Sequence, residues 1–331
     1  MERIIDNIRK CGMIKMIIDI HCHLGQPEMF PAKYIDRYAD HISKIVPSVS
    51  KEAVYNSEIM EKSFNGSPER LITEMNKAGI DRTVVFGVDW GLALGEPKVS
   101  ILDYNKYIAD AAKEYPDKLI AFFTIDPRRK NATESFEKAI YKWEMKGLKV
   151  HPSTGYLLNG PEARDLFEKA LEFNIPIISH LGYLIGLKGY LAKPMYFDEI
   201  STDYPELKIS LAHLNYGEID DLLSLMFSKS NIYCDFCAHG QILMMNSPVD
   251  FYKQIRYFMN FEGVRDKVMF GSDWPMTSNI MSLEDWVNTI KNLRSEKITD
   301  ILDRLGYKKF KNSEIKRMLG KNAQNFLDDI L

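Results

Sequence analysis

The sequence predicts a (β/α)8 TIM barrel, an α/β fold in which eight parallel strands alternate with eight helices. Short apolar runs alternate with amphipathic segments along the 331 residues, as in a chain built from βα units. Within the runs, polar and apolar residues do not alternate, as expected for strands buried on both faces. Eight such units fit one closed barrel. An open doubly wound sheet is the alternative, but no GxGxxG turn follows the first run.

Each predicted unit is an apolar run followed by a helical pattern. The first predicted helix opens with Ser67 as N-cap and Pro68 at its first position, and Gly79 is its stop signal. The predicted strands are 17–21, 83–89, 120–126, 147–151, 175–180, 208–213, 231–236 and 267–273. The helices predicted to follow them are 67–79, 103–116, 132–146, 161–173, 196–205, 218–227, 249–261 and 282–294.

Three segments modify this plan within a single predicted domain of residues 1–331. Residues 25–65 look polar and irregular and are long for a βα connection, so we expect a lid or pocket wall on the catalytic face. The patterns 298–305 and 314–327 predict extra C-terminal helices that close one end of the barrel. About sixteen residues precede the first strand, too few for several more strands, so no flanking β-sandwich is expected.

Composition is that of an ordinary globular protein, with 45% hydrophobic and 27% charged residues. The net charge is -3 and the basic residues are scattered, so nucleic acid and anionic membranes are not expected partners. No apolar run approaches the ~20 residues of a membrane span, and no secretory signal is evident. The four cysteines are too few for a disulfide framework, which favours a reducing, cytoplasmic compartment. They are Cys11, Cys22, Cys234 and Cys237.

Five polar residues end four of the apolar runs. A parallel barrel gathers the carboxyl ends of its strands on one face, where barrel enzymes carry their active sites. Imidazoles and a carboxylate that converge there make a site for a divalent transition metal. Taken singly, each residue has an ordinary interpretation as a hydrogen-bonded histidine or a helix N-cap, but their shared placement favours the metal site. These residues are His21, His23, His180, His213 and Asp273.

The first strand has an unusual distribution of side chains. Residues i and i+2 of a strand point to the same side, so Asp19, His21 and His23 are predicted to share one face. Ile20 and Cys22 are predicted to share the other face. Two imidazoles on one side can bind one ion, and Asp19 is expected to orient one of them.

Several motifs together resemble the amidohydrolase superfamily, and most closely its amidohydrolase-2 branch, which includes the aminocarboxymuconate semialdehyde decarboxylase-like enzymes. The motifs are IDIHCH, GLKVHP, PIISHLG, LKISLAHLNYG, NIYCDF and VMFGSDWP. The resemblance covers residues 16–328 and includes the closing GKNAQNFL. It implies the barrel fold and a metal-dependent enzyme without specifying a substrate.

The resemblance also implies roles for individual residues. His21 and His23 match the metal ligands of strand 1, and His180 matches the ligand of strand 5. Asp273 matches the strand-8 aspartate, which binds the metal and exchanges protons with its water. His213 matches the strand-6 histidine, which polarises the substrate or moves protons in single-metal members.

The number and identity of the metal ions depend on Lys149. In two-metal members a carboxylated strand-4 lysine bridges both ions, and GLKVHP puts Lys149 and His151 on one face of strand 4. The branch is mostly single-metal, so we favour one ion, with Lys149 available to bind a substrate carboxylate. Zinc is the expected ion for a histidine-rich site with one carboxylate, and manganese, cobalt and iron remain alternatives.

Two enzymatic functions and one non-enzymatic function fit these residues. The first is a hydrolase that uses metal-activated water on a small amide, lactone or ester. The alternative is a non-oxidative decarboxylase or hydratase of a small unsaturated or aromatic carboxylic acid. A decarboxylase needs a group that holds the substrate carboxylate, preferably arginine, and no arginine occupies a clear strand end, which favours hydrolysis. The arginines considered are Arg37, Arg70, Arg128 and Arg129.

An inactive metal-binding module is the third function considered, and it would require a missing ligand, whereas every predicted ligand is present. The resemblance makes a homodimer an expectation. Other polar or aromatic residues at strand ends are expected to serve turns and packing, although Trp274 could stack on a planar substrate. They are Asp89, Trp90, Asp126 and His239. Cys234 and Cys237 have redox-like spacing but are expected to be inert buried thiols.

Overall fold

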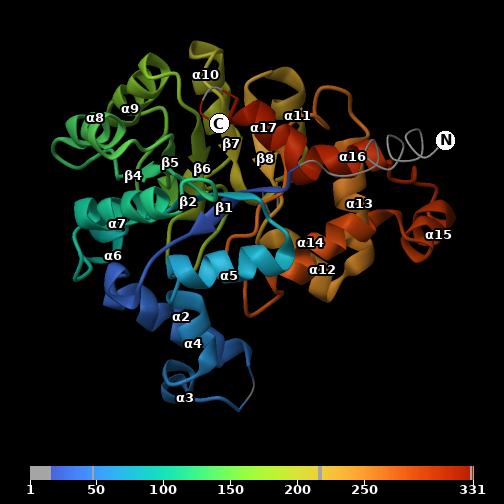
Figure 1. Cartoon of the computed structure of the whole chain (residues 1–331), viewed down its shortest axis with the longest axis horizontal. Coiled ribbons are helices and arrows are strands. Elements are labelled where there is room, and N and C mark those ends of the chain that lie inside the picture. The colour runs from blue at the N-terminus through green and yellow to red at the C-terminus, as the bar shows by residue number, and fades with distance from the viewer. Residues whose placement is uncertain (1–15, 47, 215–217, 329, 331) are drawn as a thin grey trace.

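Parallel strands occupy the centre of the computed structural model, which describes residues 16–46, 48–214, 218–328 and 330 (Figure 1). Cys11 and the predicted segment before residue 16 lie outside the described residues, as do residues 215–217 of the sixth-strand motif. The strands are β1 (Ile18–His23), β2 (Arg82–Phe86), β3 (Leu119–Ala121), β4 (Phe123–Thr124), β5 (Leu148–Val150), β6 (Ile177–Ser179), β7 (Ile209–Leu211), β8 (Ile232–Asp235) and β9 (Val268–Met269).

Hydrogen bonds join these strands into a closed barrel. The parallel orders β1-β2-β3 and β4-β5-β6-β7-β8-β9 meet at Phe122, which separates β3 from β4 and donates its N–H to Val85 O at 2.9 Å. The other seam joins β9 to β1, where Ile20 N–H donates to Phe270 O at 3.0 Å. Because β3 and β4 together form the predicted third strand, the eight predicted strands and the barrel are confirmed.

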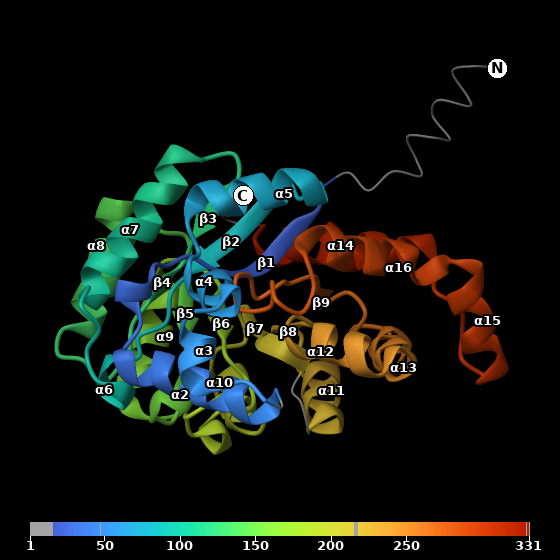
Figure 2. The ribbon, with the colours of Figure 1, turned by 90° about the horizontal axis from the view of Figure 1, so that it is seen from below.

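Helices surround the strands, from α7 and α8 on one side to α11 and α13 on the other (Figure 2). None of the described helices is long and apolar enough to cross a membrane. The helices that complete the βα units are α5 (Pro68–Ala78), α7 (Ile101–Glu114), α8 (Ala132–Trp143), α9 (Pro161–Glu172), α10 (Tyr196–Asp203), α11 (Ile219–Ser228), α13 (Pro248–Met259) and α14 (Leu283–Lys291). Shorter elements are α6 (Gly91–Leu94), α12 (His239–Asn246), η1 (Pro27–Met29), η2 (Pro152–Thr154), η3 (Gly189–Leu191), η4 (Ala212–Leu214) and η5 (Asn292–Arg294).

The first of these helices begins and ends where its sequence signals predict. Ser67 Oγ accepts a hydrogen bond from Arg70 N–H at 3.3 Å, which satisfies one of the free amides of the first turn. Pro68 occupies the first helical position, where its missing N–H costs nothing. Gly79 ends the helix with a φ of 72°, a left-handed conformation that glycine adopts without strain.

The segment 25–65 is helical, so the prediction of an irregular stretch was wrong. It contains α2 (Ala32–Ile45), α3 (Lys51–Tyr55) and α4 (Glu58–Phe64). Tyr34 and Tyr38 lie one turn apart on the buried side of α2 and pack with Phe64 and Trp90 in a cluster of their own. Ile35, Ala39 and Ile42 complete this apolar side of α2, so the helical period is present in the sequence but was missed among the charged residues between them.

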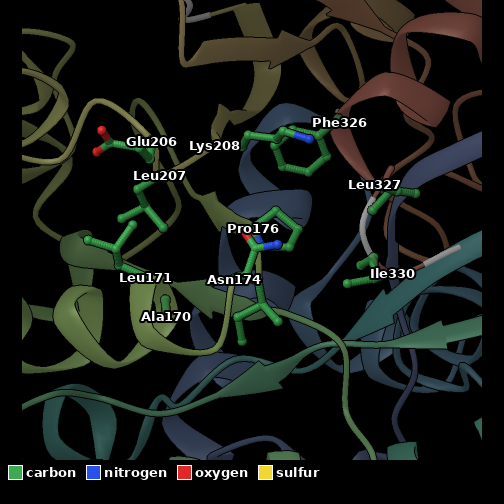
Figure 3. Close-up of a pocket in the computed structure, with 11 residues that line it drawn as sticks. Ala170, Leu171, Asn174, Pro176, Glu206, Leu207, Lys208, Phe326, Leu327 and Ile330 are labelled. Carbon is green, nitrogen blue, oxygen red and sulfur yellow. The ribbon is translucent and has the colours of Figure 1, made fainter.

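The C-terminal helices close the end of the barrel opposite α2, α3 and α4 (Figure 1). Ala323, Phe326 and Leu327 pack in the same buried cluster as strand residues such as Ile18 and Val84. Phe326 and Leu327 also border a cavity of about 50 Å³ that faces Pro176 and Leu207 (Figure 3). The predicted closing helices are α15 (Glu296–Arg304), α16 (Asn312–Lys316), the π-helical turn η6 (Arg317–Lys321) and α17 (Asn322–Phe326).

Strand β1 contains a bulge that breaks the predicted alternation of its side chains. Asp19 pairs with Thr83 and Cys22 pairs with Val85, so two residues of β1 face one residue of β2 between those pairs. Ile20 therefore packs with Ile18 in the inner cluster instead of sharing a side with Cys22. The prediction that Asp19, His21 and His23 share one face was therefore wrong, because the extra residue interrupts the alternation of side chains.

The closing helix supports a prediction on stability. Phe326→Ala should lower the free energy of unfolding by about 3–5 kcal/mol, because the buried ring leaves a cavity at the end of the barrel. Phe227→Ala on α11 is the matched control, since that ring is 67% exposed and its loss should cost roughly 0.5 kcal/mol or less. Urea unfolding of both variants tests this, and equal losses would contradict the closing role of α17.

Candidate metal centre

The five predicted site residues lie at the carboxyl ends of the barrel strands. His21 and His23 belong to β1, and His180 directly follows β6. His213 lies in the turn η4 after β7, and Asp273 lies beyond β9. All of them except His21 line one cavity, and His21 lies beneath it in contact with His23 and Asp273.

Three of the predicted metal ligands form a tight triangle of donor atoms. His21 Nε2 lies 3.2 Å from His23 Nε2 and 3.3 Å from Asp273 Oδ1. His23 Nε2 lies 3.2 Å from Asp273 Oδ1. Ligand bonds of 2.0–2.1 Å in a tetrahedral zinc site place the donors about 3.3–3.4 Å apart, so the triangle has the size of one face of such a site.

His180, the fourth predicted ligand, stands outside this triangle. Its Nδ1 lies 3.2 Å from His213 Nε2, and its buried Nε2 has no hydrogen-bond partner among the described residues. Its imidazole stacks on His151, with ring centroids 4.0 Å apart. A buried nitrogen without a partner beside two imidazoles and a carboxylate fits a divalent transition-metal ion better than it fits a packed core.

Asp235 holds the centre together, and the sequence prediction missed it. Its carboxylate accepts hydrogen bonds from His21 Nδ1 at 3.0 Å, from His213 N–H at 3.1 Å and from Cys237 N–H at 3.2 Å. Because a carboxylate only accepts, the first bond places the His21 proton on Nδ1 and leaves the lone pair on Nε2, toward the triangle. Asp235 is the last residue of β8, so the strand-end rule applied to the seventh run would have found it.

Asp19 does not orient an imidazole, which corrects the prediction. Its Oδ1 accepts hydrogen bonds from the backbone N–H groups of His21 and Ser272, both at 3.0 Å. Its Oδ2 accepts the Cys22 thiol at 3.1 Å. Burial raises the pKa of Asp19 to about 6 against these bonds. Asp19 therefore fixes the backbone at the bulge and at the end of β9, which positions the ligands indirectly.

The electrostatics of the centre favour neutral His23 and His213 beside a charged carboxylate, whereas they favour the protonated form of His21. Burial lowers the pKa of His23 to about 4 and that of His213 to about 4, although Asp273 opposes both shifts. Burial would raise the pKa of Asp273, but its bonds to His21 and His23 hold it well below the ordinary value. Burial and Lys149 lower the pKa of His21, yet Asp235 and Asp273 leave it raised overall. Metal ligands need the deprotonated forms of these groups.

Two of the site residues have left-handed backbones, which cost energy for side chains other than glycine. His213 has a φ of 75° and Asp273 a φ of 57°. Each costs of order 1–3 kcal/mol and persists only when the surroundings hold it. The bond from His213 N–H to Asp235 and the 2.7 Å bond from Asp273 N–H to His21 O supply that restraint.

The cavity above the triangle has a volume of about 70 Å³ and is largely aromatic. Phe30 and Tyr34 come from the segment 25–65, so that segment supplies part of the pocket wall. Its lining residues are His23, Phe30, Tyr34, Val88, Trp90, Lys149, His151, His180, Leu184, His213, Asp273 and Met276.

Among the described residues that line the cavity, Lys149 is the one whose side chain is ordinarily a cation. Its Nζ lies 3.4 Å from His21 Nε2 and 4.4 Å from the centre of the Phe86 ring. Burial lowers its pKa to about 8, although Asp235 and Asp273 oppose the shift. An amine with such a pKa can serve as an ammonium for an anionic substrate or, in its neutral form, react with carbon dioxide.

The arginines considered from the sequence do not line the cavity. Arg128 donates to Asp126 at 2.9 and 2.6 Å, and Arg129 donates to Asp89 at 2.5 and 2.7 Å. Arg70 is paired with Glu74, and Arg37 donates to the backbone oxygen of Gly186 at 2.6 Å.

Trp274 has the packing role that was expected of it, whereas Cys237 has a contact beyond the expected packing. Trp274 is fully buried, donates its Nε1–H to Glu74 at 3.0 Å and lies outside the cavity lining, so it is not placed to stack on a substrate. Cys234 and Cys237 are both buried free thiols. Cys237 also contacts a site residue, because its Sγ lies 3.1 Å from His213 Nδ1.

Comparisons with known proteins identify the family of the chain. The family model described as Amidohydrolase (Amidohydro_2) matches residues 18–328. No match is found among curated proteins.

Several solved structures share the fold. The 5-carboxyvanillate decarboxylase of Novosphingobium aromaticivorans, complexed with manganese, is 16% identical over 96% of this chain and 97% of that chain, with a TM-score of 0.66. The 2,6-dihydroxybenzoate decarboxylase from Rhizobium is 14% identical over 95% and 98%, with a TM-score of 0.61. A probable 2-pyrone-4,6-dicarboxylic acid hydrolase from Acinetobacter baumannii is 14% identical over 94% and 99%, with a TM-score of 0.59. At sequence identities this low, the similarity to these structures shows a shared fold and no shared reaction.

The donor triangle predicts the effect of removing two ligands. The double variant His21→Ala with His23→Ala should lose its bound metal while keeping a folded barrel, because two of the three clustered donors are gone. Elemental analysis per chain measures the loss, and circular dichroism checks the fold. His41→Ala, an exposed residue of α2, is the control and should keep its metal. Stoichiometric metal in the double variant would rule out this site.

Asp235 gives a second prediction at the same centre. Asp235→Asn should weaken metal binding by about 10- to 100-fold, because the uncharged amide no longer holds His21 in the required tautomer. A chelator competition titration measures the affinity. Asp110→Asn on the exposed side of α7 serves as control. Unchanged affinity in Asp235→Asn would mean that the contact with His21 is only structural.

Proposed function

This chain belongs to the amidohydrolase family, and we propose on that premise that it is a metal-dependent hydrolase of a small amide, lactone or ester. The observation that carries the proposal is the triangle of His21 Nε2, His23 Nε2 and Asp273 Oδ1 at the floor of a small aromatic cavity. A cavity of about 70 Å³ suits a small molecule better than a polymer.

His21, His23 and Asp273 would hold the metal ion, with His180 as the fourth ligand through its unpartnered Nε2. When bound, a divalent ion lowers the pKa of water toward about 7 and polarises a substrate oxygen. We favour a single zinc ion for this histidine-rich set. Manganese is the alternative that the solved 5-carboxyvanillate decarboxylase suggests.

Asp273 and His213 are the residues placed to move protons. Asp273 lines the cavity, and its bonds to His21 and His23 keep it as the carboxylate, the form to which an attacking water can give a proton. The same bonds lower its pKa and so weaken it as a base. His213 lines the same cavity, and its Nδ1 is held by Cys237 while its Nε2 faces His180. If His180 offers the lone pair of Nε2, its proton lies on Nδ1 and is donated to His213 Nε2. The neutral His213 imidazole is then an acceptor at Nε2 and can take up a proton during the reaction.

Decarboxylation is the second candidate, and a specific observation supports it. Lys149 lines the cavity beside aromatic walls, so an anionic planar acid would find both a cation and stacking surfaces there. Two of the solved structures with this fold are decarboxylases of aromatic acids. The lack of an arginine among the lining residues keeps hydrolysis first.

Isotope labels separate the two reactions. The metal-loaded protein would be offered lactones, esters, amides and carboxyl-¹³C aromatic acids in H₂¹⁸O. Hydrolysis places ¹⁸O in the product acid, whereas decarboxylation releases ¹³CO₂ and leaves the ring free of ¹⁸O. Release of ¹³CO₂ without ¹⁸O incorporation would overturn the hydrolase proposal in favour of the second candidate.

The assignment of His213 gives a kinetic prediction. His213→Asn should lower kcat by about 10²- to 10⁴-fold, the contribution usual for a positioned proton-transfer group. The metal content should stay at the wild-type level, because the donor triangle does not include this residue. Steady-state kinetics and elemental analysis on the same preparation test both statements. A parallel loss of metal and activity would make His213 a ligand instead of a proton-transfer group.

The number of metal ions per chain distinguishes the two possible roles of Lys149, substrate binding and metal bridging. One ion per chain supports the single-metal proposal, with Lys149 as a substrate-binding cation. Two ions per chain, reduced to one by Lys149→Met, would show that a carboxylated lysine bridges a second ion.

A further inference from the structure

Trp90 lines the cavity with a hydrogen-bond donor that has no partner. The residue is 5% exposed, and its indole Nε1 is buried without a hydrogen bond to any described residue. The other two fully buried tryptophans have partners, since Trp274 Nε1 donates to Glu74 at 3.0 Å and Trp286 Nε1 donates to Gly271 O at 2.9 Å. Buried polar groups without partners are rare and cost about 1–3 kcal/mol each, so the exception calls for a ligand.

The indole ring of Trp90 is held in place from two sides. Tyr34 of α2 stacks on it with ring centroids 4.4 Å apart and planes 22° apart. His151 packs against it at 5.4 Å and continues into the stacked ring of His180. A row of rings therefore runs from the segment 25–65 to the metal centre, and its members cannot turn away without breaking several contacts.

The backbone that carries Trp90 is fixed as firmly as its ring. Its neighbour Asp89 accepts two hydrogen bonds from Arg129, at 2.5 and 2.7 Å. Asp89 also accepts the backbone N–H of Gly91 at 3.3 Å and that of Asp126 at 2.8 Å. Four hydrogen bonds to one carboxylate therefore hold the segment that carries the unpartnered N–H.

We propose that Trp90 is a substrate-binding residue whose indole N–H donates to an oxygen of the substrate, with Tyr34 holding the ring in position. The inference rests on the proposed function, because it concerns the same cavity. The N–H is already desolvated in the folded protein. A hydrogen bond to a substrate oxygen therefore forms without a further desolvation cost for the donor. The segment 25–65 then contributes to substrate recognition through Tyr34 in addition to covering the site.

The test uses the metal-loaded, ¹⁵N-tryptophan-labelled protein with benzoate as a planar, oxygen-bearing probe. The chain has four tryptophans, so the spectrum has four indole N–H signals, and Trp90→Phe identifies the signal that belongs to Trp90. Benzoate should move that signal downfield and leave the signals of Trp274 and Trp286 in place, because those two N–H groups are already bonded. A merely structural Trp90 would not give this change.

Affinities measured by calorimetry complete the test. Trp90→Phe keeps an aromatic ring but removes the N–H and should weaken benzoate binding by about tenfold, the effect of one hydrogen bond. Trp143→Phe on the outer helix α8 is the matched control and should bind as the wild type does. Tyr34→Ala should weaken binding by removing the support of the ring, whereas Tyr38→Phe one turn along α2 should not.

Several outcomes would overturn the proposal. Failure of the metal-loaded wild type to bind benzoate is one, and binding that leaves the Trp90 signal unmoved is another. Equal affinities for the wild type and Trp90→Phe would also overturn it. Each of these results is independent of turnover, so a failure of the proposed hydrolysis, which the ¹⁸O experiment detects, remains distinguishable from a failure of this inference.

Discussion

The contact between Asp235 and His21 is the interaction on which the metal centre depends. One carboxylate at the end of β8 accepts hydrogen bonds from the imidazole Nδ1–H of His21 on β1 and from the backbone N–H groups of His213 and Cys237. Burial would raise the pKa of Asp235, but His21 and these neighbours bring it below the ordinary value, so the group stays charged. A single buried charge thereby fixes the tautomer of a ligand and the left-handed turn that presents His213.

The rest of the site follows from how a barrel presents its strand ends. The seam between β9 and β1 brings Asp273 to His21 by a backbone hydrogen bond and leaves its carboxylate beside two imidazoles. The bulge in β1 allows Ile20 to fill the inner cluster while His21 remains at the floor of the cavity. In a regular strand Ile20 and His21 would point to opposite faces, and the extra residue of the bulge changes that alternation.

The sequence predicts the barrel and the gathering of the site residues because both depend on short-range patterns. Apolar runs, caps such as Ser67 and polar residues at strand ends can be read locally, and each has a direct structural counterpart. The helices of 25–65 are harder to predict because α3 and α4 have only 5 and 7 residues, and charged residues separate the apolar positions of α2. The bulge is also hard to predict, since Asp19 acts through backbone amides that a sequence pattern does not reveal. Asp235 ends β8, so a polar residue at a strand end also marks it in the sequence.

The seam that closes the barrel joins segments far apart in the chain, and this governs the order in which the centre can form. His21 and His23 are made early, but the partners that hold their strand, such as Phe270 and Asp273, come some 250 positions later. The turn η6 is later still, where Gly320 lies so close to Met16 O that any Cβ would collide with it. Contacts between such distant segments form slowly because a long loop must close first. During synthesis nearly the whole polypeptide is therefore needed before the two histidines can lie beside Asp273.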